Sequence, residues 1–334
     1  LVTGGGGFLG GAIVRQLLAR GDHVRTIQRG DYPWLEAAGA AVRQGDLTEL
    51  DDVRDAVEGV DVVIHVAAKA GVWGDYEDYF AANYAATANV IGACIHHGVT
   101  RLVYTSSPSV TFSGKDEEGI DESAPYPDHY LAAYPNTKAQ AERTVLAANA
   151  EDLATVALRP HLIWGPGDRH LVPRIIARAK AGKLKLVGDG SNLVDSTYID
   201  NAAHEHVLAA DQLMRDGPRA VCAGQAYVIR KGEPLAMADL INRILAAGDL
   251  PPVRKRVSPR IAYAAGAVLE GLYRLFRVER EPIMTRFVAK QLATAHWFDI
   301  SAAGRDLGYE PIVSIDEGMQ RLTASLRGEG EAAA

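Results

Sequence analysis

Cysteine, positive charge and long hydrophobic runs are all scarce in this sequence. Its 334 residues include only two cysteines, which argues against the disulfide framework of a secreted protein and favours a reducing cytoplasm. The formal net charge of −7 gives no basic footprint for nucleic acid. No signal peptide is visible, although the chain starts at Leu1 rather than Met and we expect a few residues to precede it. We therefore expect a cytoplasmic protein that binds no nucleic acid.

Strand and helix patterns alternate through the first half of the chain. The continuous apolar run at 60–67 is typical of a parallel strand that is buried on both faces. We expect strands at 23–28, 41–44, 60–67, 101–106 and 155–159, and helices at 9–20, 76–97, 130–150 and 172–180. This order predicts the α/β class, with a doubly wound parallel sheet.

A glycine-rich turn follows the first short strand and predicts a dinucleotide site. Glycines recur three residues apart at Gly4, Gly7 and Gly10, and Phe8 and Leu9 open the helix behind them. Glycine lets the backbone turn sharply and approach a pyrophosphate, whose charge meets the N-terminus of the helix. The strand before the turn and the helix after it favour this interpretation over a simple tight turn.

The glycine turn assigns the first half of the chain to a dinucleotide-binding Rossmann domain. A chain of 334 residues exceeds one typical core, so we expect a second, smaller lobe. We predict the Rossmann domain at 1–165, with a returning segment near 192–226. An interleaved substrate lobe is expected at 166–191 and 227–327, and a disordered tail at 328–334.

The end of the second strand bears on the choice between NAD and NADP. NAD sites place a carboxylate there for the ribose 2′-hydroxyl, whereas NADP sites offer an arginine for the 2′-phosphate. This strand ends in Gln28-Arg29, with no carboxylate at its tip. We expect a preference for NADP(H), with NAD(H) also accepted; the alternative is that Arg29 is a solvated surface residue. Asp46 and Leu47, after the third strand, are expected beside the adenine.

Tyr134 and Lys138 lie four residues apart in a predicted helix and so share one of its faces. A nearby ammonium favours the phenolate, so we expect Lys138 to lower the pKa of Tyr134 toward the range of useful proton transfer. A Tyr-x-x-x-Lys pattern is common by chance. It gains weight here because it stands between the fifth and sixth strands of a chain that opens with the glycine turn.

Hydroxyl side chains end the fifth strand at Thr105, Ser106 and Ser107, where one of them can hold a substrate oxygen beside the tyrosine. Ser107 is our choice and Ser106 is the second candidate, and at least one of these residues merely ends the strand. Asn83, in the helix after the fourth strand, is expected to orient Lys138 through water. An ordinary helix-surface asparagine is the alternative.

Together these motifs resemble the extended short-chain dehydrogenase/reductase family over nearly the whole chain. The resemblance is carried by Thr3-Gly4-x-x-Gly7-x-x-Gly10, Asn83, Ser107, Tyr134, Lys138, Arg159-Pro160 and the stretch 307–311. Within the family, 101–107 and 195–201 are similar to the 3β-hydroxysteroid dehydrogenase-like branch. The stretches 69–74 and 188–193 look closest to its 2-alkyl-3-oxoalkanoate reductases of bacterial long-chain olefin biosynthesis.

The resemblance implies hydride transfer from NADPH to the ketone of a hydrophobic 3-oxo acid, which gives a 3-hydroxy acid. Tyr134 would donate the proton, Lys138 would hold the ribose, and Ser107 would orient the carbonyl. Lys69 would lie near the cofactor or pair with a substrate carboxylate, unless it is a loop lysine in water. Further cofactor contacts are implied for Ala67, Ala68, Thr105, Pro160, His161 and Ile163.

Other activities on the same fold stay open. A 3β-hydroxysteroid dehydrogenase is the main rival; a nucleotide-sugar epimerase would usually favour NAD, which conflicts with Arg29. A sugar-nucleotide dehydratase is expected to carry an Asp-Glu pair where this chain has Pro108 and Ser109. A non-catalytic NADP-binding regulator would have lost Tyr134 or Lys138.

Histidine pairs raise the question of a metal site. His96-His97 and His204-x-His206 have no carboxylate or cysteine at ligand spacing. We therefore expect no metal and interpret all four histidines as solvated helix residues.

The stretch 261–278 is apolar with basic edges. Glu270 and Arg274 interrupt it, and it is too short to cross a bilayer, which takes about 20 apolar residues. A basic-edged amphipathic helix can lie on a membrane surface or dock a partner, such as a sister enzyme of the pathway. The more ordinary alternative is a lid helix over the substrate pocket. A homodimer also stays open.

Overall fold

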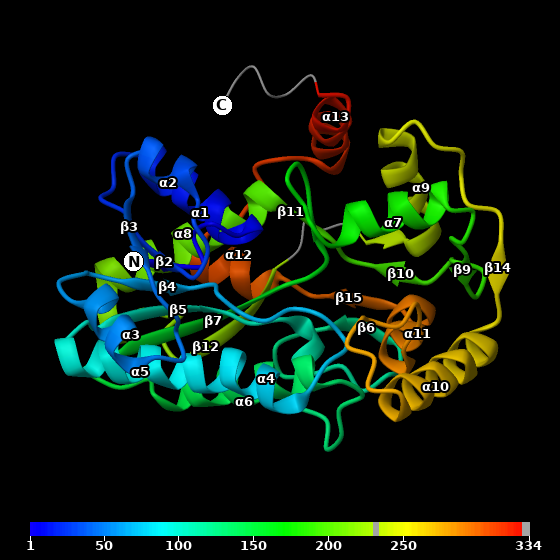
Figure 1. Cartoon of the computed structure of the whole chain (residues 1–334). Helices are drawn as coiled ribbons and strands as arrows, with labels where there is room; N and C mark the ends of the chain where they lie inside the picture. Colours follow the sequence, from blue (N-terminus) through cyan, green and yellow to red (C-terminus); the bar gives the residue numbers. More distant parts are fainter. Residues whose placement is uncertain (230–233, 329–334) are drawn as a thin grey trace.

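A seven-stranded parallel sheet forms the centre of the larger part of the molecule (Figure 1). The computed structural model describes residues 1–229 and 234–328, so the predicted tail lies outside the described residues beyond 328. The strand order is β12-β7-β5-β4-β1-β2-β3. The strands are β1 (Val2–Thr3), β2 (Arg25–Gln28), β3 (Ala41–Gln44), β4 (Val63–His65), β5 (Arg101–Thr105), β7 (Ala154–Pro160) and β12 (Gln225–Ile229). This doubly wound Rossmann order confirms the predicted fold class.

The middle strands are apolar because helices cover both of their faces. Every residue of β4 and β7 is buried, as the continuous apolar runs predict. The run at 60–67 contributes only three residues to the sheet, however. Its first residues turn out of helix α3, where the N–H of Val60 donates to the carbonyl of Val57.

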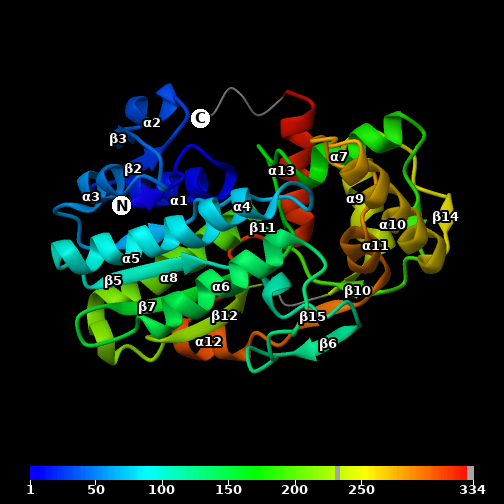
Figure 2. The ribbon, with the colours of Figure 1, turned by 60° about the horizontal axis from the view of Figure 1, so that its bottom comes forward.

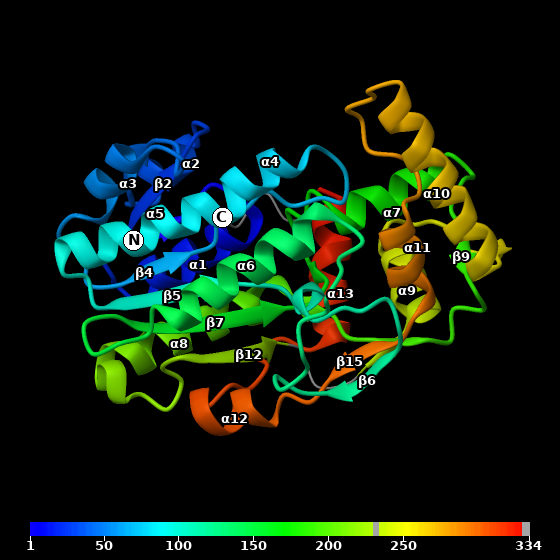
Figure 3. The same cartoon turned by 90° about the horizontal axis from the view of Figure 1, so that it is seen from below.

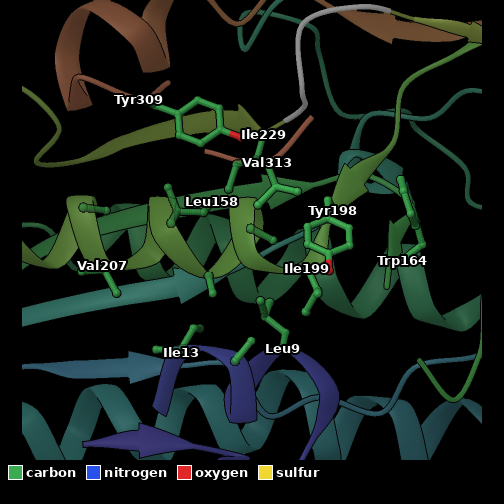
Figure 4. Packing of buried hydrophobic residues seen from close by; sticks show 14 of the residues in the cluster. Leu9, Ile13, Leu158, Trp164, Tyr198, Ile199, Val207, Ile229, Tyr309 and Val313 are labelled. Carbon is green, nitrogen blue, oxygen red and sulfur yellow. The ribbon is translucent and has the colours of Figure 1, made fainter. Parts of the chain in front are cut away.

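The two faces of the sheet carry different sets of helices (Figures 2 and 3). One face is covered by α1 (Phe8–Ala19), α8 (Ile199–Asp216) and α12 (Ser301–Leu307). The other is covered by α3 (Leu50–Val57), α5 (Ala86–His97) and α6 (Ala133–Ala147). Near α1, Leu9 and Ile13 point toward α8, and both belong to the same buried cluster as Ile199 and Leu158 (Figure 4). The glycine turn is thus anchored to the core through α1.

The helix expected at 76–97 is continuous but irregular. It begins as α4 (Tyr76–Tyr79), passes through the π-helical stretch η1 (Phe80–Ala85) and continues as α5. Such π-helical stretches often occur at functional sites. Asn83 lies in η1, and its side chain is buried rather than on the helix surface.

A smaller lobe lies beside the carboxyl ends of the sheet strands (Figure 1). Its four-stranded sheet has the order β13-β10-β15-β6, from β6 (Glu117–Ile120), β10 (Leu193–Val194), β13 (Leu235–Ala236) and β15 (His296–Phe298). Its helices are α7 (Leu171–Lys180), α9 (Met237–Ala247), α10 (Pro259–Leu275) and α11 (Arg286–Ala293). Strand β6 joins this lobe from the first half of the chain, and α12 returns from the second half to cover β12. The chain therefore crosses between the two parts, and the predicted domain boundaries stay a prediction.

Short elements connect these parts. Two further strand pairs are β8 (Ile163–Trp164) with β11 (Thr197–Tyr198), and β9 (Leu186–Val187) with β14 (Arg256–Val257). The remaining helices are α2 (Pro33–Ala37), α13 (Ile315–Leu326) and the 3-10 turns η2 (Pro108–Val110) and η3 (Gly217–Arg219). Within the described residues, no helix is both long and apolar enough to cross a membrane.

Candidate active site

The carboxyl ends of the large sheet's strands open into a cavity of about 760 Å³. All but one of the predicted site residues line it. The lining set is Gly4, Gly7, Phe8, Leu9, Gly10, Gln28, Arg29, Asp46, Leu47, Ala67, Ala68, Lys69, Thr105, Ser107, Tyr134, Lys138, Pro160, His161 and Ile163. Asn83 is the exception, since it lies behind the cavity wall.

The glycine turn leaves space for a pyrophosphate. Gly4 has a φ of +70°, which side-chain-bearing residues rarely adopt, and a Cβ at Gly10 would lie 2.2 Å from the carbonyl oxygen of Gly4. Helix α1 begins after Gly7 with no side-chain cap, so its first N–H groups are free to meet an anion. The carboxamide of Gln28 is buried with no hydrogen-bond partner among the described residues. These residues fit a dinucleotide cofactor.

A hydrogen-bond chain runs beneath the glycine turn. The Thr3 hydroxyl accepts from the backbone N–H groups of 66–67 and lies 2.8 Å from His65 Nδ1. His65 Nε2 lies 3.0 Å from the Thr87 hydroxyl, which donates to the carbonyl of Asn83. Burial, reinforced by Lys138, lowers the pKa of His65 to about 3. His65 is therefore neutral, accepts from Thr3 at Nδ1 and donates to Thr87 at Nε2.

Asn83 fastens the loop after β4 to helix α6. Its Oδ1 accepts from the backbone N–H of Lys69 at 2.7 Å, and its Nδ2 donates to the Lys69 carbonyl at 3.2 Å. Nδ2 also donates to the Thr137 hydroxyl at 3.1 Å. No direct bond joins Asn83 to Lys138 in the described part of the chain, so its action on Lys138 through water stays a prediction.

The Lys138 side chain is bonded to the end of β5, and its expected effect on the pKa of Tyr134 stays a prediction. Lys138 Nζ donates to the carbonyl of Thr105 at 2.5 Å and lies 4.3 Å from the ring centre of Tyr104. Burial lowers the pKa of Lys138 to about 7, against the opposing charge of Glu142. Burial raises the pKa of Tyr134, and the hydroxyl of Ser107 acts in the opposite direction. The ammonium is turned toward β5, while the hydroxyl of Ser107 moderates the phenol.

The two candidate serines differ in their surroundings. Ser107 caps the turn η2, and its Oγ lies 2.9 Å from that of Ser109. The hydroxyl of Ser106 is buried and has no partner among the described residues. Both serines line the cavity, but Ser107 is the one in contact with Tyr134. Its role, like that of the other site residues, stays a prediction.

His206 corrects the interpretation of the helix histidines. It is fully buried rather than solvated, because α8 packs against the sheet. Its Nδ1 donates to the carbonyl of Ala202 at 2.7 Å, so its Nε2 accepts from the Thr105 hydroxyl at 2.8 Å. His206 thus supports the strand end that carries Ser107. No group of three potential metal ligands occurs in the described ranges.

Two charged residues at the cavity have carboxylates nearby. The Arg29 side chain is 79% exposed, and its Nη1 lies 3.7 Å from Asp46 Oδ2. This long contact leaves the guanidinium accessible. Lys69 Nζ, by contrast, lies 2.7 Å from Asp78 Oδ2 and 5.0 Å from the ring centre of Tyr79. Lys69 therefore already has a counter-ion, which weakens its case as a partner of a substrate carboxylate.

Comparison with known proteins agrees with this geometry. Residues 1–256 match the model of the 3-beta hydroxysteroid dehydrogenase/isomerase family. The chain belongs to this family. It is an NAD(P)-dependent oxidoreductase of the extended short-chain dehydrogenase/reductase type.

Relatives of this family member cover nearly the whole chain. A 2-alkyl-3-oxoalkanoate reductase of Shewanella oneidensis is 55% identical over 97% of this chain and 85% of its own length. A protein of the same description from Stenotrophomonas maltophilia is 54% identical over 97% of this chain and 98% of its own length. Among solved structures, MoeE5 in complex with UDP-glucose and NAD has a TM-score of 0.73 and 25% identity, over 98% of both chains.

The cavity of this protein has a further wall that the sequence analysis did not predict. Phe287 and Gln291 of α11, together with Asp168 and His170 before α7, line it. Asp168 caps α7 by accepting from the backbone N–H groups of residues 170–172, a helix-start signal that the sequence does offer. Thr285 gives α11 a similar start signal, since its hydroxyl accepts from the backbone N–H of Val288, but nothing in the sequence places α11 at the cavity.

His161 belongs to a buried histidine pair that the sequence did not reveal. Its Nε2 lies 2.8 Å from His296 Nδ1, and His296 Nε2 lies 2.7 Å from the carbonyl of Gln291. A carbonyl can only accept, so His296 donates to it and accepts from His161. Burial lowers the pKa of both histidines, which keeps the pair neutral. His161 thus faces the cavity with its orientation fixed from α11.

Helix α10 bears on the alternatives left open for 261–278. No residue of α10 lines the cavity, which gives the lid alternative no support. Helix α11 lies between α10 and the sheet and supplies the wall instead (Figure 3).

Proposed function

We propose that this protein reduces the ketone of a 2-alkyl-3-oxoalkanoate to a 3-hydroxy acid with NADPH. The observation that carries the proposal is that Ser107, Tyr134 and Lys138 line the same cavity as the glycine turn. The relatives at 54–55% identity support the substrate class. Phe287 and Leu162, which also line the cavity, give an alkyl chain apolar contacts.

The cavity residues can perform each proton step of this reduction. The bound cofactor supplies the hydride. Tyr134 is neutral, because burial raises its pKa, and so has a proton to donate to the oxygen on which charge develops. The Ser107 hydroxyl donates to the same oxygen and holds it beside the phenol. Thr105 positions Lys138 through its carbonyl, and the glycine turn with the start of α1 holds the pyrophosphate.

A substrate panel tests the proposal. Oxidation of NADPH by the purified protein is measured with a 2-alkyl-3-oxo acid, a 3-oxosteroid and a nucleotide sugar. We expect turnover with the first, and kcat/KM that rises with the length of its alkyl chains because each buried methylene contributes about 0.8 kcal/mol. Preferred turnover of the steroid or the sugar would instead support one of the two rival activities.

The proposed preference for NADPH rests on Arg29. Its exposed guanidinium lines the cavity, and a charge-assisted bond to the 2′-phosphate is worth about 1.5–3 kcal/mol. Arg29→Glu should therefore weaken NADPH binding by roughly 10- to 150-fold and change NADH binding little. Arg43→Glu is the matched control, since this exposed arginine on the next strand does not line the cavity. Equal losses for both cofactors in the Arg29 variant would refute the assignment.

A further inference from the structure

The outer face of helix α10 is apolar and uncovered. Apart from Ala267, its exposed apolar residues follow a spacing of three or four positions and form one stripe: Ile261, Ala264, Ala265, Val268, Leu272 and Leu275. Ile261 and Leu275 are 63% and 73% exposed. Phe276 and Ile283, at 71% and 65%, continue the stripe beyond the helix. Contiguous exposed apolar patches are uncommon on monomeric soluble proteins and mark interaction sites. We call this stripe, from 261 to 283, the α10 surface.

Helix α10 is held to the lobe by its opposite face. A Cβ at Gly266 would lie 2.6 Å from the backbone of Thr285, so the two segments are in close contact there. Glu270 is buried, and its carboxylate accepts from the backbone N–H of Arg286 at 2.6 Å and from its Nε at 2.9 Å. The contacts that hold α10 to the lobe therefore do not involve its apolar stripe. The stripe is a surface feature rather than part of the core.

Basic residues flank the α10 surface. The segment 254–283 contains seven basic residues against three acidic ones, in a chain whose net charge is −7. Two of the acidic residues are already paired, Glu270 with Arg286 and Glu281 with Arg174. The basic residues are all exposed: Arg254, Lys255, Arg256, Arg260, Arg274, Arg277 and Arg280. The surface thus combines an apolar stripe with local positive charge.

The segment that carries the α10 surface contacts two elements that line the cavity. The loop 69–72 lines the cavity and leads directly into Trp73. Trp73 Nε1 donates to the carbonyl of Val278 at 3.0 Å, and its ring packs edge-on against Tyr273. Helix α11, against which α10 packs, lines the cavity through Phe287. A molecule held at the α10 surface is therefore close to both elements that border the site (Figure 3).

We propose that the α10 surface docks on an anionic lipid bilayer. The apolar stripe would enter the boundary between headgroups and acyl chains, and the flanking arginines would meet lipid phosphates. A second copy of the chain fits less well, because a two-fold contact would bring the same arginines face to face. The value of such docking for an apolar substrate rests on the proposed function, whereas vesicle binding does not.

Co-sedimentation of the full chain with vesicles tests this proposal. We expect binding to phosphatidylcholine vesicles that contain phosphatidylglycerol, little binding without it, and weaker binding as salt is raised. Arg277→Gln with Arg280→Gln should weaken binding by about 30-fold, and Leu275→Ser with Phe276→Ser by at least ~10-fold. Val221→Ser is the control, because Val221 is 69% exposed outside this surface. Thermal unfolding confirms that each variant is folded.

Three results would overturn the proposal. One is a wild-type protein that does not bind the anionic vesicles, whatever its activity on the ketone panel. The second is a folded stripe variant that binds as tightly as the wild type. The third is a dimer that forms without vesicles and is lost with the same substitutions, which would assign the surface to a second copy of the chain.

Discussion

Replacing Tyr134 by Phe is expected to lower kcat by about 100- to 10,000-fold, the usual contribution of a general acid. The substitution removes the phenolic proton and little else, since the ring still fills its place beside Ser107. Affinity for NADPH should stay within a few fold, because the glycine turn and Arg29 are unchanged. The measurements are kcat with a 2-alkyl-3-oxo acid and cofactor binding by fluorescence titration.

Tyr84→Phe provides the matched control for this variant. Tyr84 lies in η1 next to Asn83, stacks on Phe80 with ring centres 4.8 Å apart, and does not line the cavity. The same loss of a hydroxyl there should leave kcat unchanged. Near wild-type turnover in the Tyr134 variant would show that another group donates the proton.

The second large effect is expected in stability, from the buried ion pair between Arg159 and Glu142. Arg159 Nε and Nη2 donate to the two carboxylate oxygens at 2.9 and 2.7 Å, and the side chains are only 4% and 0% exposed. Arg159→Met would leave Glu142 with Tyr126 as its remaining donor. Removal of one partner of such a pair costs about 3–5 kcal/mol, which urea unfolding should detect as a lower midpoint.

A double variant separates the buried charge from the packing. Glu142→Leu combined with Arg159→Met removes both charges, and apolar replacements of buried pairs are often neutral or stabilising. We therefore expect the double variant to be more stable than Arg159→Met alone. If both variants lose the same free energy of unfolding, the packing of α6 on β7 is responsible rather than the unpaired carboxylate.

Local patterns were sufficient to predict most of the large sheet, although not its edge strand β12. Strands β5 and β7 are largely apolar runs, β2 and β3 are short segments in the strand–helix alternation, and parallel strands place their carboxyl ends at one edge. The glycine turn follows β1 and Ser107 follows β5, whereas Tyr134 lies on α6, the helix that leads to β7. These residues line one cavity because of the sheet topology, which the order of strands and helices in the sequence predicts.

The second wall of the cavity depends on contacts that the sequence pattern does not contain. Strand β6 pairs with β15 across more than half of the chain, and α11, which lines the cavity, directly precedes β15. The same holds for the His161–His296 pair, whose members stand 135 residues apart. The direction of Lys138 also could not be predicted, because its partner is a backbone carbonyl, which every residue has.

The row of groups from Thr3 through His65 and Thr87 to Asn83 has a consequence for motion at the site. Thr3, His65 and Thr87 each have one proton to donate, and the row ends at the carbonyl of Asn83, which can only accept. The row therefore admits one polarity only, because reversal would leave the Thr87 oxygen and this carbonyl facing each other as two acceptors. The backbone beneath the glycine turn and the loop held by Asn83 should therefore move together as one rigid unit. Room for a bulky branched chain then has to come from the opposite side, where α11 of the smaller lobe forms the wall.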